Sequence, residues 1–218
     1  MKSILIYGGS FDPPHLGHLK TALAVQDYFH FDTVFFLPCK TPVLKKPTQA
    51  EASHRLQMLQ LMLNLEKAVE SRFNHHPEFE ISTVEIDRDT PSYMTETLQQ
   101  IRETVGHACS ITLLLGMDAV LSLPQWHEHE TLPRLCNLLV IKREGVTEHE
   151  PLTGLFPEPC HHARDLLSHP NGKIEYFDAG DYPISSTDIR EKIRSGQDVS
   201  DALPKAVDDY IKHHGLYQ

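Results

Sequence analysis

Two imidazole side chains, His15 and His18, lie within a stretch near the start of the chain that begins with two glycines. This stretch, "GGSFDPPHLGHL", comes directly after the apolar run "SILIY". Gly8 and Gly9 allow a sharp turn and a close approach to a ligand, and two consecutive prolines stiffen the loop before a helix that begins near His15. Backbone amides, the positive end of that helix and the imidazoles could then contact phosphate oxygens. A glycine-rich turn with two surface histidines is the plainer interpretation.

A second candidate phosphate site lies near the other end of the chain, in "PISSTDIREKI", residues 183–193. Ser185 and Ser186 offer hydroxyls and helix-start amides, and Arg190 follows about one helical turn later. The same residues are also a good helix N-cap without any ligand. Neither a P-loop pattern nor a GxGxxG dinucleotide fingerprint accompanies the first stretch, which disfavours those two classes of site.

Strand-like and helix-like stretches alternate along the chain. This alternation predicts an α/β, Rossmann-like fold whose mostly parallel sheet has helices on both faces. In such folds ligands bind at the carboxyl ends of the strands, where the first candidate loop lies. The predicted strands are residues 3–7, 33–38, 79–88, 110–116, 137–142 and 173–178, and the predicted helices are residues 18–29, a long helix after a capping box at 48–51, and 92–106.

The chain length of 218 residues fits one large domain or one domain with an appendage, and we expect a single domain over residues 1–218. The helical part from about residue 183 to 218 is expected to pack against the rest. Residues 145–172, with several prolines, histidines and glycines, predict an irregular insertion.

Composition excludes several classes of function. A formal net charge of −10 argues against broad binding to nucleic acid, because phosphate backbones are held chiefly by clustered Lys and Arg. No run approaches the ~18 apolar residues of a membrane span, and residues 1–10 lead into a strand pattern instead of a signal peptide, so a cytoplasmic protein is expected. The four cysteines are widely spaced and predict free thiols. The fifteen histidines suggest a metal-binding module as an alternative, but none has HExxH spacing.

The two candidate sites together resemble the signatures of the nucleotidyltransferase superfamily, GxFxPxHxGH and ISSTxxR. Residues 9–18 and 184–190 match these patterns position for position. Within the superfamily the chain resembles the bacterial nicotinate-nucleotide adenylyltransferases nearly from end to end. Three further segments carry that resemblance: "EIDRDTPSYMTETL" (85–98), "LLGMDAVLSLPQWHEHETL" (114–132) and "LPKAVDDYIKHHGLY" (203–217).

The resemblance implies a reaction of NAD biosynthesis. The phosphate of nicotinate mononucleotide attacks the α-phosphorus of ATP in line, giving nicotinate adenine dinucleotide and pyrophosphate without a covalent enzyme intermediate. It implies His15, His18 and Arg190 as catalytic residues, and Mg²⁺ held through the substrate phosphates and not by a protein metal site. The implied ATP-binding residues are Gly8, Gly9, Ser10, Phe11, Lys45, Gly116, Asp118, Ile184, Ser185 and Ser186.

The implied residues for nicotinate mononucleotide are Tyr93, Met94, Trp126 and His127. Trp126, the only tryptophan, would stack on the pyridine ring while backbone amides receive the carboxylate; a packing tryptophan is the alternative. Asp118 would accept from ribose hydroxyls, although a plain acidic residue at a helix start has the same position. Met94 stands where the family has threonine, and Leu44 where it commonly has histidine.

Two matters stay open in the sequence. The adenylyl acceptor could be another phosphate-bearing molecule, such as nicotinamide mononucleotide or phosphopantetheine. The chain could act as a monomer or as a homodimer.

Overall fold

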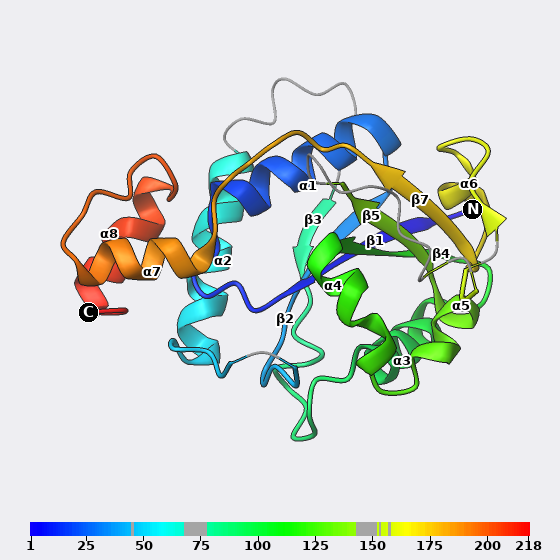
Figure 1. Ribbon diagram of the computed structural model, residues 1–218, viewed down its shortest axis with the longest axis horizontal. Helices are drawn as coiled ribbons and strands as arrows, with labels where there is room; N and C mark the ends of the chain where they lie inside the picture. The colour runs from blue at the N-terminus through cyan, green and yellow to red at the C-terminus, as the bar shows by residue number, and fades with distance from the viewer. Residues whose placement is uncertain (45, 68–77, 143–151, 153, 157) are drawn as a thin grey trace.

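The computed structural model describes residues 1–44, 46–67, 78–142, 152, 154–156 and 158–218. Within these residues seven strands form one sheet in the order β3-β2-β1-β4-β5-β7-β6, and every neighbouring pair is parallel (Figure 1). The predicted α/β class with a parallel sheet is confirmed. The strands are β1 (Ser3–Gly9), β2 (Thr33–Pro38), β3 (Glu78–Ile81), β4 (Ser110–Gly116), β5 (Asn137–Ile141), β6 (Glu158–Pro159) and β7 (Lys173–Phe177).

Helices connect the strands and lie on both sides of the sheet. They are α1 (Leu16–Phe29), α2 (Ala52–Lys67), α3 (Met94–Val105), α4 (Met117–Ser122), α5 (Leu132–Leu135), α6 (Asp165–Ser168), α7 (Ser186–Arg194) and α8 (Lys205–His214). Two short 3-10 helices, η2 (Leu123–Gln125) and η3 (His129–Thr131), lie between α4 and α5.

The side chains of β1 alternate between two hydrophobic cores. Leu5 packs into a core shared with α1 and α2, whereas Ile4 and Ile6 pack into a core shared with α3, α4 and α5. All three side chains are fully buried. This strand is apolar on both faces because each face is covered by helices, as parallel sheets require.

The order of the strands reverses between β1 and β4. From β1 the chain builds β2 and β3 on one side, and then β4 and β5 on the other. The helices after β1 and β4 therefore leave the sheet on opposite faces, and the carboxyl ends of these two strands open into a crevice. The first candidate loop and Asp118 follow these two strand ends.

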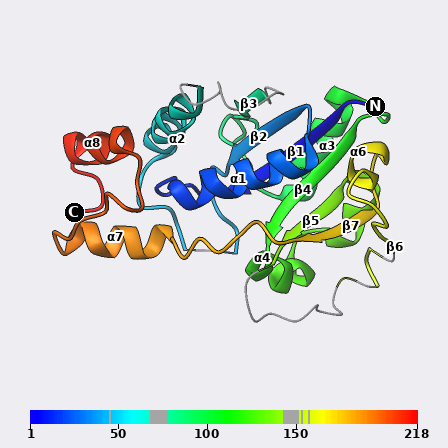
Figure 2. The same cartoon turned by 90° about the horizontal axis from the view of Figure 1, so that it is seen from above.

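The C-terminal helices lie at one end of the molecule, beside α2 (Figures 1 and 2). Ile189 of α7, Val207 and Ile211 of α8, and Tyr217 belong to the same hydrophobic core as Met58 of α2. A segment that follows β7 leads to α7 and brings "ISSTDIR" back toward the loop after β1 (Figure 2).

Three local predictions were wrong. The strand predicted over 79–88 ends at Ile81, because the chain then turns and directs Glu85 inward, where it is 2% exposed. The capping box predicted at 48–51 does not start α2, which begins at Ala52, because the amides of Gln49 and Ala50 donate to Asp12 instead. Gly8 and Gly9 make no sharp turn: they end β1, paired with Leu37 and Pro38.

Other expectations were confirmed. Helix α1 begins beside His15, α3 ends at Gly106 with φ of 84°, and the four cysteines are free thiols. The predicted insertion at 145–172 lies partly outside the described residues; its described part is less irregular than predicted, since β6 pairs with β7. No helix in the described part of the chain is both long enough and apolar enough to cross a bilayer.

The buried guanidinium of Arg102 connects several segments at the amino-terminal edge of the sheet through hydrogen bonds. Arg102 of α3 is 5% exposed and donates to the carbonyl oxygens of Gly106, Cys109, Leu135 and Pro170. These carbonyls come from three separate parts of the chain. One side chain thus joins α3 to the segments before β4, β5 and β7.

We expect Arg102→Met to lower the free energy of unfolding by about 3 kcal/mol or more, because a buried guanidinium and its hydrogen bonds to four buried or part-buried carbonyls are lost. Urea denaturation monitored by circular dichroism measures this difference. Arg134→Met is the matched control, because Arg134 lies exposed in α5 and its loss should cost less than about 0.5 kcal/mol. Equal losses in both variants would contradict the structural role of Arg102.

Candidate active site

The loop after β1 departs from ordinary backbone geometry at Phe11. Its φ of 49° lies in the left-handed region, which a bulky residue rarely adopts. The Phe11 ring is 1% exposed and packs against Tyr7, Phe36 and His18, with ring centroids 5.0 to 5.8 Å apart. Packing of this ring beneath the loop compensates for the strained backbone.

His15 and His18 form a reciprocal pair at the start of α1. The Nδ1 atom of His15 accepts from the amide of His18 at 3.4 Å, and the Nδ1 atom of His18 accepts from the amide of His15 at 3.2 Å. The two rings are stacked with centroids 3.7 Å apart. Because both Nδ1 atoms are acceptors, the neutral rings carry their protons on Nε2, which leaves two N–H groups as donors on the far side of the rings.

The start of α7 is fastened to the loop after β1. Ser185 is the N-cap of α7, and the hydroxyl of Ser186 donates to the carbonyl of Pro13 at 2.9 Å. Arg190 donates to the carbonyl of Asp12 at 2.6 Å and to the hydroxyl of Thr187 at 3.3 Å. The two motifs that the sequence places at opposite ends of the chain therefore form one structural unit.

A cleft of about 1000 Å³ opens at the carboxyl ends of β1, β4, β5 and β7. It brings together residues of both motifs with the end of β4. Of the residues that the sequence analysis assigned to catalysis and to ATP, the cleft is lined by Gly8, Gly9, Ser10, His15, His18, Gly116, Asp118, Ile184, Ser185, Ser186 and Arg190.

Among the assigned residues that the structure describes, Phe11 does not line this cleft. Phe11 is 1% exposed, and its ring packs beneath the loop against Tyr7, Phe36 and His18. Lys45 lies outside the described residues. The neighbouring Lys46 lines the cleft and was not assigned from the sequence.

The sequence analysis also missed Lys142, Asp178 and Tyr182, which line the cleft beyond the ends of β5 and β7. Lys142 and Asp178 are the last residues of two predicted strands, and that position was the available signal, since the ends of parallel strands converge at one edge of a sheet. Lys20 of α1 lies over the Tyr182 ring, with its Nζ 5.7 Å from the centroid.

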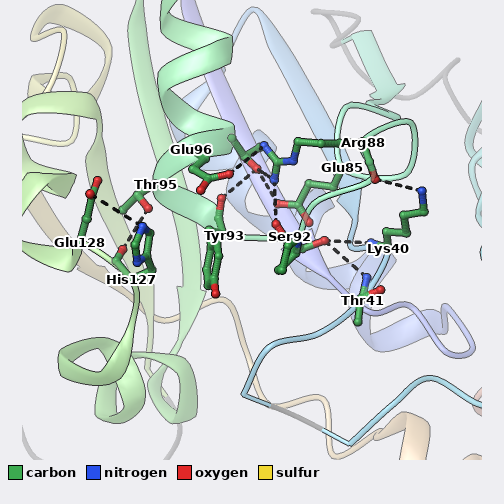
Figure 3. A network of polar contacts seen from close by, with 12 residues as sticks. Lys40, Thr41, Glu85, Arg88, Ser92, Tyr93, Thr95, Glu96, His127 and Glu128 are labelled. Carbon is green, nitrogen blue, oxygen red and sulfur yellow. Dashed lines mark hydrogen bonds and ion pairs between the residues drawn. The ribbon is translucent and has the colours of Figure 1, made fainter.

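The four residues assigned to nicotinate mononucleotide form a second cluster. The rings of Tyr93 and His127 lie 4.5 Å apart, and Thr95 of α3 donates its hydroxyl to the carbonyl of His127 at 2.9 Å (Figure 3). Trp126 is half-buried, and its Nε1 donates to Ser122 at 3.2 Å. None of the four lines the cleft described above.

Met94 connects this cluster to the cleft. It is the first residue of α3, whose N-cap Tyr93 provides no side-chain hydrogen bond to the helix. A Cβ atom built on Gly8 would lie 2.9 Å from the Met94 terminal methyl, so the methionine packs directly on the end of β1. A side chain at position 8 would require the flexible end of Met94 to shift.

A polar network positions the start of α3 (Figure 3). The Ser92 hydroxyl accepts from the amides of Lys40 and Thr41, at 3.1 and 3.5 Å, and Thr97 donates to the Glu85 carboxylate at 2.9 Å. Burial raises the pKa of Glu85, although hydrogen bonds with Thr97 and Ser92 oppose that shift. The network joins the loop after β2 to the loop before α3.

The residues described in the structure contain no cluster of three or more His, Cys, Asp or Glu side chains that could hold a metal ion. The Asp12 carboxylate, which lies at the cleft, already accepts hydrogen bonds from Gln49, Ala50 and Tyr217. A divalent ion at this site would therefore take its ligands chiefly from substrate oxygens.

A parallel sheet with a ligand cleft at its order reversal, two stacked imidazoles and a helix start facing that cleft define a nucleotide-binding α/β protein. The cytidylyltransferase-like family model matches residues 6–192. The chain is 45% identical, over the whole of both chains, to a nicotinate-nucleotide adenylyltransferase of Legionella pneumophila (strain Corby). It is 37% identical to one of Cronobacter sakazakii, over 97% of this chain and 94% of that one.

The fold is similar to that of nicotinic acid mononucleotide adenylyltransferase from Plasmodium falciparum, solved in complex with NaAD, with a TM-score of 0.74. That match covers 100% of this chain and 98% of the other, at 21% identity. The chain belongs to the cytidylyltransferase-like family and, within it, to the nicotinate-nucleotide adenylyltransferases.

Burial lowers the pKa of His15 from 6.5 to about 4, so the folded protein holds this imidazole neutral at pH 7. Between those two values the unfolded chain binds a proton that the folded protein does not, and the free energy of unfolding falls as the pH drops. For this group the loss between pH 7 and pH 5 is about 2 kcal/mol. His15→Gln should therefore lose about 2 kcal/mol less than the wild type over the same range, measured by urea denaturation. Equal losses would show that His15 titrates normally.

Proposed function

We propose that this protein transfers the adenylyl group of ATP to nicotinate mononucleotide, giving nicotinate adenine dinucleotide and pyrophosphate in NAD biosynthesis. The observation that carries the proposal is the full-length identity of 45% to a nicotinate-nucleotide adenylyltransferase. The convergence of both motifs on one cleft supports it, because each motif supplies groups suited to phosphate.

The reaction needs no protein nucleophile. An oxygen of the mononucleotide phosphate forms a bond to the α-phosphorus of ATP, while the bond from that phosphorus to the bridging oxygen of pyrophosphate breaks. The attacking phosphate is already anionic near neutral pH, so the protein aligns the two substrates and stabilises the charge that moves onto pyrophosphate.

In this proposal His15 and His18 act on the ATP phosphates as hydrogen-bond donors through Nε2. Their Nδ1 atoms are engaged by each other's amides, which fixes the direction of both rings. The depressed pKa of His15 makes it a neutral donor, so positive charge must come from other groups. Arg190 and the amides at the start of α7 are assigned to the β- and γ-phosphates, with the amides of Ser10 and Phe11 beside them.

Asp118, exposed in the first turn of α4 and at the cleft, is assigned to the ribose hydroxyls of ATP. Mg²⁺ would be held through the substrate phosphates, whose negative charge it partly offsets when bound. The protein's part is then to orient those phosphates with the two imidazoles, Arg190 and the loop amides.

We further propose a single domain over residues 1–218, monomeric or homodimeric in the cytoplasm, which acts without nucleic acid.

The nicotinate ring is assigned to the cluster around Trp126. The start of α3 lacks a side-chain cap, which leaves amides near Met94 for an anionic group. The ring of His127 packs against that of Tyr93, tilted by 35°, and the backbone amide of His127 is assigned to the carboxylate as well. Loss of the family's threonine hydroxyl at position 94 does not remove the main-chain donor.

His18→Ala should lower kcat by about 100-fold, because charge developing on the phosphates loses a positioned donor. Steady-state release of pyrophosphate measures this change. His107→Ala is the matched control, since His107 is exposed in the turn between α3 and β4. A folded His18→Ala protein with near-normal kcat would remove His18 from the catalytic residues.

Side-by-side turnover of nicotinate and nicotinamide mononucleotides with MgATP tests the proposed substrate. A pocket lined by amides accepts both oxygens of the carboxylate, whereas the NH₂ of the carboxamide leaves donors unpaired. Two such donors give an expected preference of about 100-fold or more for the acid in kcat/KM. Equal use of both mononucleotides would contradict the amide-lined pocket, and no dinucleotide from either would favour a different acceptor.

A further inference from the structure

The carboxylate of Asp12, in the loop after β1, accepts hydrogen bonds from distant parts of the chain. It is 3% exposed and accepts hydrogen bonds from the amides of Gln49 and Ala50, at 2.7 and 3.1 Å. A third hydrogen bond comes from the hydroxyl of Tyr217, at 2.7 Å. Tyr217 is the next-to-last residue of the chain, 205 positions away.

Tyr217 is held in place to make this contact. Gly215 ends α8 in the left-handed region, with φ of 60°, and the amide of Leu216 donates to Ile211 at 3.0 Å. The Tyr217 backbone also has a positive φ of 67°, and its ring is 7% exposed within the core shared with α2 and α8. A strained backbone at a buried aromatic residue persists only where surrounding contacts stabilise it.

The Tyr217 hydroxyl acts as a donor over the working pH range. Burial raises the pKa of this phenol well above its ordinary value, and the neighbouring Asp12 carboxylate raises it further. A hydrogen bond from a neutral donor to a buried carboxylate is stronger than one between two neutral groups.

The main chain of the loop that contains Asp12 is hydrogen-bonded to side chains from other parts of the protein. Arg55, fully buried in α2, donates to the carbonyl of Ser10 at 2.7 Å, while Arg190 donates to the carbonyl of Asp12. Between these two carbonyls lies Phe11 with its positive φ. The Asp12 side chain is the anchor on the other side of Phe11 from Arg55, so its hydrogen bonds fix the direction of the backbone that follows.

We propose that Tyr217 is a positioning residue for adenylyl transfer: through Asp12 it holds the loop whose amides and histidines contact the ATP phosphates. Tyr217 touches no substrate in this proposal, which rests on the function proposed above. Loss of this hydroxyl should therefore weaken the binding of ATP. It should leave the binding of nicotinate mononucleotide at the cluster around Trp126 unchanged.

Tyr217→Phe tests the proposal, because it removes one hydroxyl and keeps the buried ring. We expect kcat to fall about 10-fold and KM for ATP to rise about 3- to 10-fold, with KM for nicotinate mononucleotide within about 2-fold of the wild type. Isothermal titration with a non-hydrolysable ATP analogue should show the same weakening of ATP binding. A purely structural loss would lower the fraction of active protein and leave both KM values and the dissociation constant unchanged.

Tyr210→Phe is the matched control. The Tyr210 hydroxyl also joins the C-terminal helix to α2, through Nδ1 of His54 at 2.9 Å, and among the described residues no hydrogen bond links it to the loop after β1. It should leave kcat and both KM values within about 2-fold of the wild type. Equal effects in the two variants would overturn the proposal, and so would an unchanged KM for ATP in Tyr217→Phe.

Asp12→Asn provides a second variant at the other end of the hydrogen bond. It should reproduce the rise in KM for ATP, and the double variant Asp12→Asn/Tyr217→Phe should show little further loss beyond Asp12→Asn alone. Additive losses, or loss of the fold in both single variants, would overturn the positioning role. Failure of the wild type to make dinucleotide would count against the proposed function, whereas the titration with the ATP analogue tests the loop contact separately.

Discussion

The structure depends on hydrogen bonds to the oxygen atoms of a short, largely buried loop, residues 10–15. The loop after β1 must leave the sheet, pass a phenylalanine with a positive φ and enter α1, and no regular element satisfies its carbonyls on the way. Partners for these oxygens come from Arg55, Ser186, Arg190 and Tyr217. An unpaired buried polar group costs about 1–3 kcal/mol, so the loop and its distant partners stabilise one another.

This requirement explains the position of the C-terminal helices. Residues beyond β7 could have formed an independent appendage, but Ser186 and Arg190 contact main-chain oxygens of the loop after β1. The apolar face of α8 packs into the same core as α2. Hydrophobic burial sets the approximate place of α7 and α8, and directional hydrogen bonds set the register in which α7 meets the cleft.

The two stacked histidines also pair main-chain groups with side chains, here at the start of α1. Each ring accepts from the backbone amide of the other residue, so the helix start is capped by groups that also face the cleft. The pairing fixes both tautomers, and burial keeps His15 neutral. The phosphate site proposed here would work through oriented N–H dipoles more than through net charge, which agrees with a chain whose formal charge is −10.

The sequence by itself determined the class of fold, the two segments that meet at the cleft and several of the residues that line it, because apolar periodicity and turn residues act over a few neighbouring positions. It did not determine that Gly8 and Gly9 continue a strand, since pairing with β2 comes from elsewhere in the chain. It also missed the turn at Glu85, whose inward direction depends on Thr97 of α3. Only the tertiary structure decided that the hydroxyl of Tyr217 reaches Asp12, because a contact across 205 residues depends on the packing of every element between them.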